Sequence, residues 1–202
     1  LDVSTIKEMP PGRKPVDTRL LGESEMDSVF EFIRQEVTNG YQVFVVYPLK
    51  KPSPDSELQD LQSGARRVQQ QVPSALVERV HGESDEKDEI MEAFAGGDID
   101  VLCSTTVVEV GVDVPNATTM IVKEADFFGL SQLHQLRGRV GRPDVQSYCM
   151  LMTQGGVTDK AQRRLSAMAE TNDGFEIAET DLDIRGVGNF LGTRQSGMPG
   201  MH

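Results

Sequence analysis

The stretch that decides the fold is Val43-Phe44-Val45-Val46-Tyr47, an uninterrupted apolar run that ends at Pro48. A strand with one face in solvent alternates apolar and polar residues, whereas a strand covered on both faces is apolar throughout. We therefore expect a central strand of a parallel sheet that has helices on both faces.

The segments around this run repeat an alternation of helix and strand. A helix is predicted from Ser24 to Val37, because its apolar residues recur at helical spacing and Asn39-Gly40 closes the pattern. Further apolar runs predict strands at 101–103, 120–122 and 148–152, and helices at 85–94 and 131–142. The polar stretch 55–71 has only weak periodicity. This order predicts an open, mainly parallel α/β sheet with right-handed crossovers.

The pattern changes after Thr153. Two helical segments, about 158–171 and 175–183, flank the turn Asn172-Asp173-Gly174, and the glycine-rich stretch 186–192 is predicted to be a loop. We expect three parts, which are an incoming linker and first strand (1–22), the main α/β domain (23–153), and a helical hairpin with its loop (154–202).

Composition narrows the classes of protein. A net charge of −12 argues against a protein that coats nucleic acid by bulk electrostatics, so any DNA contact must be local. Cys103 and Cys149 lie inside apolar runs and are predicted to be core residues. The sequence has no disulfide framework and no membrane-length apolar run, which favours a cytoplasmic protein. The first residue is Leu1, and we expect a fragment of a longer chain.

The richest chemical signal is the stretch 132–142, Gln-Leu-His-Gln-Leu-Arg-Gly-Arg-Val-Gly-Arg. On a continuous helix, steps of three or four residues would place four polar side chains on one face: Gln132, Gln135, Arg139 and Arg142. Guanidinium groups suit phosphate, because their planar fork binds two oxygens and never loses its charge. An exposed basic helix with two tolerated glycines is the alternative interpretation.

A row of hydroxyls, Ser104-Thr105-Thr106, begins where the predicted strand 101–103 ends. Ligands of open α/β sheets bind beyond the carboxyl ends of the strands, so these side chains are well placed to meet phosphates. The alternative is a turn whose hydroxyls satisfy its own backbone.

From Val101 to Arg142 the chain resembles motifs V and VI of superfamily 2 helicases, and more narrowly the RecG helicase family. The resemblance rests on 111–117 and 128–142 and extends to 1–4, 10–13, 47–49, 81–82, 172–175 and 192–197. It implies a RecA-like second motor domain of a translocase that acts on double-stranded, branched DNA. The translocase Mfd carries motif VI in nearly this form, but the stretch 192–195 favours RecG. Pro143-Asp144 departs from the family pattern.

The resemblance also implies roles for single residues. Arg139 and Arg142 would be arginine fingers that reach the γ-phosphate of ATP, and Gln135, Gly111 and Asp113 would border the nucleotide. Contacts to the DNA backbone would come from Thr105, Thr106 and His81. Three residues of the hairpin and loop would couple nucleotide state to movement along DNA: Arg164, Arg185 and Gln195.

The sequence lacks the other half of an ATPase site. It has no Gly-x-x-x-x-Gly-Lys-Ser/Thr loop, and none of its apolar strands ends in an Asp-Glu-x-His element that could hold Mg²⁺. We therefore expect a monomeric protein in which a first RecA-like domain of the same chain holds ATP and Mg²⁺, so that this part alone does not hydrolyse ATP. A non-enzymatic DNA- or protein-binding adaptor and an Mfd-like coupling domain remain the alternatives.

Overall fold

The computed structural model describes residues 14–50, 54–82, 85–105 and 114–197. Its centre is a six-stranded sheet of order β1-β6-β5-β2-β4-β3, in which every pair of neighbours is parallel. The strands are β1 (Asp17–Gly22), β2 (Gln42–Tyr47), β3 (Val77–Val80), β4 (Val101–Thr105), β5 (Ala117–Val122) and β6 (Tyr148–Thr153). The predicted open parallel α/β sheet is confirmed.

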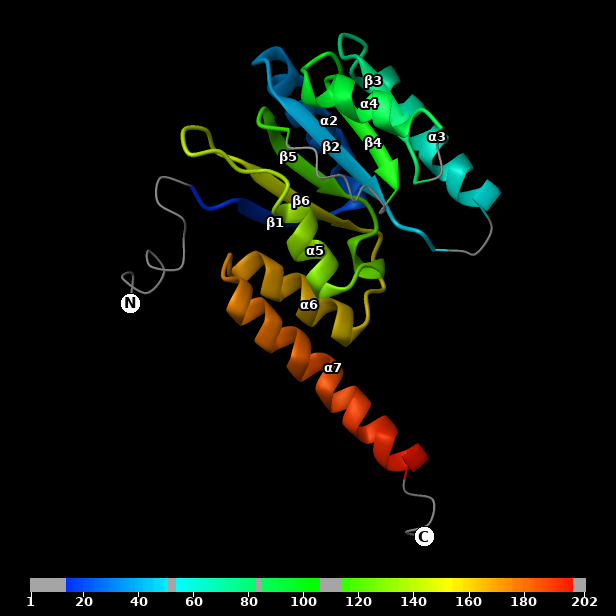
Figure 1. Cartoon of the computed structure of the whole chain (residues 1–202), viewed down its shortest axis with the longest axis vertical. Coiled ribbons are helices and arrows are strands. Elements are labelled where there is room, and N and C mark those ends of the chain that lie inside the picture. Colours follow the sequence, from blue (N-terminus) through cyan, green and yellow to red (C-terminus); the bar gives the residue numbers. More distant parts are fainter. Residues whose placement is uncertain (1–13, 51–53, 83–84, 106–113, 198–202) are drawn as a thin grey trace.

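Helices cover both faces of the sheet, as the run 43–47 predicted (Figure 1). All six residues of β2 are buried, and the five from Val43 to Tyr47 alternate between two apolar clusters. Val43 and Val45 pack with α2 (Met26–Thr38) and α3 (Pro54–Gln71), whereas Phe44 and Val46 pack with α4 (Lys87–Ala95) and α5 (Leu130–Arg137). This alternation follows from the pleat, which points successive side chains to opposite faces.

The two cysteines confirm the predicted core. Cys103 and Cys149 are free and fully buried, and each thiol has its pKa raised to about 12 by burial. The polar stretch 55–71, for which periodicity predicted no clear element, forms α3. Its apolar stripe of Leu61, Ala65 and Val68, which Val72 continues just after the helix, is narrow but has the spacing of one helical face.

The helical hairpin forms, but the predicted loop 186–192 does not. Thr158 caps α6 (Asp159–Glu170) by accepting a hydrogen bond from Ala161, and α7 (Gly174–Gly197) follows a short turn. α7 continues as one helix through the glycine-rich stretch and extends away from the sheet (Figure 1). Each glycine costs only about 1 kcal/mol of helix stability, so glycines weaken a helix without forbidding it.

No helix within the described ranges is both long and apolar enough to cross a membrane.

Candidate functional site

The arginine-rich stretch 132–142 is not one continuous helix, which corrects the predicted helical face. α5 ends at Arg137, and Gly138 is its C-terminal cap. The next turn tightens, because the N–H of Arg139 bonds the carbonyl of Leu136 and the N–H of Val140 bonds that of Arg137. Gly141 has a φ of 134°, a conformation that glycine tolerates best. The two predicted fingers therefore lie in a short extension, 138–142, which we call the finger segment.

Arg139 lies over the carboxyl end of β4. Its side chain lines a small pocket together with Ser104 and Thr105, and apolar residues of β2, β5 and α5 form the rest of the wall: Phe44, Val46, Met120 and Leu136. The Ser104 hydroxyl is buried and has no hydrogen-bond partner in the described part of the chain. The structure therefore brings together one predicted finger and the beginning of the predicted hydroxyl row.

Arg142 lies at the other end of the connection that leads from β4 to β5. Its Nη1 donates to Oδ1 of Asn116 at 2.9 Å, and its Nε lies 3.3 Å from Oδ1 of Asp144. Asn116 precedes β5 and donates in turn to the carbonyl of Gly40. The sequence departure Pro143-Asp144 thus supplies the carboxylate that pairs with Arg142.

Arg139 and Arg142 thus lie at the two described ends of the connection from β4 to β5. Thr106, Gly111 and Asp113 lie within 106–113, outside the described residues. Gln135 is exposed on α5, and Gln132 instead accepts a hydrogen bond from the N–H of Gly129 at the start of the helix. The predicted roles of Thr106, Gly111, Asp113 and Gln135 stay predictions.

Two of the predicted DNA contacts, His81 and Thr105, lie at the carboxyl ends of neighbouring strands. Val80 pairs with Ser104 in the register of β3 and β4, so His81 and Thr105 leave these neighbouring strands at the same level. His81 is half-buried, whereas Thr105 is only 3% exposed. Thr105 therefore offers little surface to DNA in this state.

The three predicted coupling residues are spread out. Arg164 on α6 donates to the carbonyl of Asp126 at 3.1 Å, and Arg185 pairs with Asp181 of its own helix at 2.8 Å. Gln195 lies in α7 rather than in a loop. No contact joins Arg164 to Arg185 within the residues that the structure describes.

Sequence reasoning missed Arg137, the buried member of the arginine-rich stretch. The residue is 3% exposed, and its Nη1 donates to the Met168 carbonyl at 2.5 Å and to Oγ1 of Thr18 at 3.1 Å. Burial lowers the pKa of this guanidinium. A signal was present, because Leu130, Leu133 and Arg137 have the spacing of one helical face and all three are buried.

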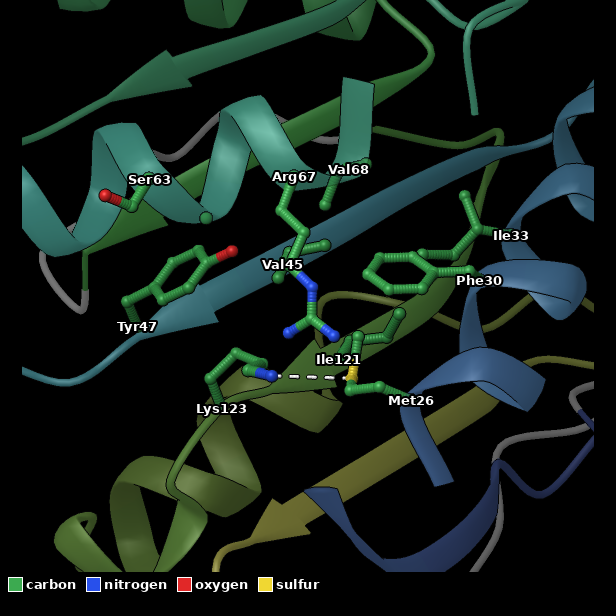
Figure 2. Close-up of a pocket in the computed structure, with 11 residues that line it drawn as sticks. Met26, Phe30, Ile33, Val45, Tyr47, Ser63, Arg67, Val68, Ile121 and Lys123 are labelled. Carbon is green, nitrogen blue, oxygen red and sulfur yellow. Dashed lines mark hydrogen bonds between the residues drawn. The ribbon is translucent and has the colours of Figure 1, made fainter. Parts of the chain in front are cut away.

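A separate pocket of about 200 Å³ lies on the other face of the sheet, between α2 and α3. Figure 2 shows the Arg67 side chain reaching between Tyr47 and Phe30 toward Lys123. The Arg67 guanidinium lies 5.2 Å from the centre of the Phe30 ring, and Lys123 pairs with Glu23 at 2.5 Å. Because the sheet separates it from the finger segment, this pocket is not part of the same site.

Comparisons with known proteins place these features in a family. Residues 25–144 match the model of the helicase conserved C-terminal domain, and residues 171–200 match the C-terminal part of domain 3 of the ATP-dependent DNA helicase RecG. Curated proteins named ATP-dependent DNA helicase RecG are 47% identical in Staphylococcus aureus and 45% identical in Synechocystis, over 98% of this chain. The chain spans only 29% and 24% of their respective lengths.

Solved structures agree with the sequence matches. A structure of RecG bound to a three-way DNA junction superposes with a TM-score of 0.74 at 43% identity, and the match covers 86% of this chain and 23% of that one. The DUF1998 helicase MrfA bound to DNA superposes with a TM-score of 0.52 at 18% identity, over 79% of this chain and 21% of that one. The second likeness shows the fold alone.

Proposed function

The chain belongs to the family of helicase C-terminal domains and carries the C-terminal part of domain 3 of RecG, and from this we propose that it is the second motor domain of a double-stranded DNA translocase. The whole protein would act on branched DNA as a monomer. One observation supports the proposal: Arg139 lines a pocket with Ser104 and Thr105 at the end of β4, and Arg142 hydrogen-bonds Asn116 at the start of β5. Two permanent cations thus lie near the described ends of two neighbouring elements, β4 and β5.

The chemistry proposed for these cations is charge stabilisation. Phosphoryl transfer builds charge on the equatorial oxygens of the transferred group, and arginine fingers typically accelerate it by about 10³ to 10⁵. Arg139 and Arg142 would bind those oxygens while a first RecA-like domain of the same protein holds the phosphates of ATP. In this proposal, Mg²⁺ would be held by the first domain together with those phosphates.

Arg142 would have to exchange partners during the cycle. Its contacts to Asp144 and Asn116 are partly exposed, and surface ion pairs contribute only about 0 to 1 kcal/mol. A phosphate oxygen can therefore displace them when the two motor domains close. Asp144 would hold Arg142 in the open state and take it back after release of phosphate.

DNA would be contacted at the carboxyl edge of β3 and β4, where His81 and Thr105 lie at the same level and Thr106 follows. The acidic chain, of net charge −12, favours a few local contacts to the DNA backbone over a broad basic surface. Arg164, Arg185 and Gln195 would take part in coupling through the hairpin α6–α7, which packs against α5.

ATP hydrolysis tests this proposal directly. The fragment 1–202 is expected to show no ATPase activity alone or with DNA, because it lacks the loop that cradles phosphates. In the full-length protein, Arg139→Ala is expected to abolish DNA-stimulated hydrolysis. Hydrolysis at the wild-type rate would instead indicate an adaptor domain, and co-purification with RNA polymerase would indicate a coupling role like that of Mfd.

A further inference from the structure

Arg137 lies where α5, α6 and β1 meet. Its Nη1 donates to the carbonyl of Met168 and to the hydroxyl of Thr18 on β1. Met168 is in the last turn of α6. Carbonyl groups there find no N–H donor further along the helix, and this end of the helix dipole is negative. A cation from α5 therefore completes the end of α6.

His134, one turn earlier on α5, faces the beginning of α7. A Cβ atom on Gly174 would lie 3.3 Å from its Nε2, so the backbone of α7 approaches the ring closely. Burial lowers the pKa of His134 and the charge of Arg137 lowers it further, while Asp173 raises it. Asp173 also accepts a hydrogen bond from the N–H of Phe175. His134 and Arg137, three residues apart on α5, thus lie against the two sides of the hairpin turn.

Stability alone does not account for a guanidinium at this junction. Its two acceptors are neutral, no ion pair joins it to a carboxylate in the described ranges, and its Nη2 is buried without a hydrogen-bond partner there. Burying a charge without a charged partner is costly, and an apolar side chain of similar length would avoid that cost. The spare donor means that a small movement of α5 can change how Arg137 is bonded.

We propose that Arg137 is a positioning residue that transmits displacement of the finger segment to the hairpin. This inference rests on the proposed function. The finger segment begins at Gly138, directly after Arg137, so movement of Arg139 toward a phosphate pulls on the end of α5. Arg137 passes that movement to α6 through Met168 and to β1 through Thr18. Arg137 itself does not touch nucleotide or DNA.

Coupling in the full-length protein is the property to measure. ATP hydrolysis and unwinding of a DNA fork are followed together for Arg137→Met, with Arg163→Met, an exposed arginine on α6, as the matched control. We expect Arg137→Met to retain kcat and KM for ATP within about twofold and to lower base pairs unwound per ATP by roughly tenfold, the range seen for residues along coupling networks. Arg163→Met should match the wild type.

Two conservative variants separate coupling from folding. Arg137→Lys keeps the charge but has no fork, and should recover part of the unwinding per ATP. Thr18→Val removes one acceptor of Arg137 and leaves the Met168 carbonyl. It should lower the number of base pairs unwound per ATP less than Arg137→Met does. If Arg137→Met does not fold, these two variants decide, and a wild-type ratio in both would overturn the inference.

The outcomes also separate this inference from the proposed function. Normal unwinding per ATP in Arg137→Met, together with loss of hydrolysis in Arg139→Ala, would overturn the coupling role and keep the fingers. Normal hydrolysis in Arg139→Ala would overturn the proposed function. Equal loss of hydrolysis and unwinding in Arg137→Met would show that Arg137 serves the ATP site rather than coupling.

Discussion

Arg137 and Arg142 belong to the same arginine-rich stretch but have opposite environments. Arg137 is buried and bonds a backbone carbonyl and a hydroxyl, whereas Arg142 is partly exposed and bonds a carboxylate and an amide. Gly138 ends the helix between them. Arg137 is therefore held in the core, whereas Arg142 lies beyond the helix and can exchange partners. The environment of each arginine therefore depends on its position relative to the end of α5, and not on the side-chain type alone.

Loss of the exposed cation should have the largest effect on activity. In the full-length protein, Arg142→Ala is expected to lower DNA-stimulated ATP hydrolysis by about 10³, the low end of the range for an arginine finger. Because its contacts are on the surface, the free energy of unfolding should change by less than about 0.5 kcal/mol. Steady-state hydrolysis and urea unfolding measure the two quantities. A large loss of stability would put Arg142 in the same class as Arg137.

Truncation of the buried cation should have the largest effect on stability. Arg137→Ala removes the bond to the Met168 carbonyl and leaves a cavity, and we expect the free energy of unfolding to fall by about 2 to 3 kcal/mol. Urea unfolding followed by circular dichroism measures the change, with exposed Arg163→Ala as control. A change below about 0.5 kcal/mol would mean that the junction is not packed as described.

The pairing of Arg142 can be loosened without removing it. Asp144→Asn removes the carboxylate charge that pairs with Arg142. Phosphate would then compete with a weaker partner for Arg142, so Arg142 is released more easily. We expect kcat/KM for ATP to rise by a few fold, since surface ion pairs are worth about 0 to 1 kcal/mol. High salt should reduce the difference from the wild type. A fall in kcat/KM would show that Asp144 positions the finger instead of holding it back.

The smallest expected effect is the pH dependence at His134. Its pKa in the folded state is below 6.5, chiefly because of burial, so the unfolded chain binds more protons as pH falls through this range. Stability should therefore decrease from pH 7 toward the lowered pKa. The slope of unfolding free energy against pH should be shallower in His134→Asn. Identical slopes would contradict a lowered pKa of the half-buried His134 ring.

Periodicity predicted the sheet because a strand that is buried on both faces is a continuous apolar run, as at 43–47. It did not predict the end of α5, where the pattern of Leu133, Leu136 and Val140 continues past a glycine that ends the helix. It also missed α7 beyond 186, because glycine propensity is a weak guide within a long helix.

The candidate site could be predicted only in part. Guanidinium chemistry is local, so the residue types alone made Arg139 and Arg142 candidates for binding phosphate, and that role stays a prediction. The partners Asn116, Thr18 and Met168 could not be predicted, because chain topology brings them to these arginines from distant elements.

The most direct test of the fingers compares two ligands of the full-length protein. ADP with aluminium fluoride imitates the transferred phosphoryl group, whereas ADP alone does not. Arg139→Ala is expected to weaken binding of the first by roughly 10² or more and to leave ADP affinity unchanged, because the finger acts only as charge develops. If Arg139→Ala bound ADP with aluminium fluoride as tightly as the wild type does, the account would be contradicted.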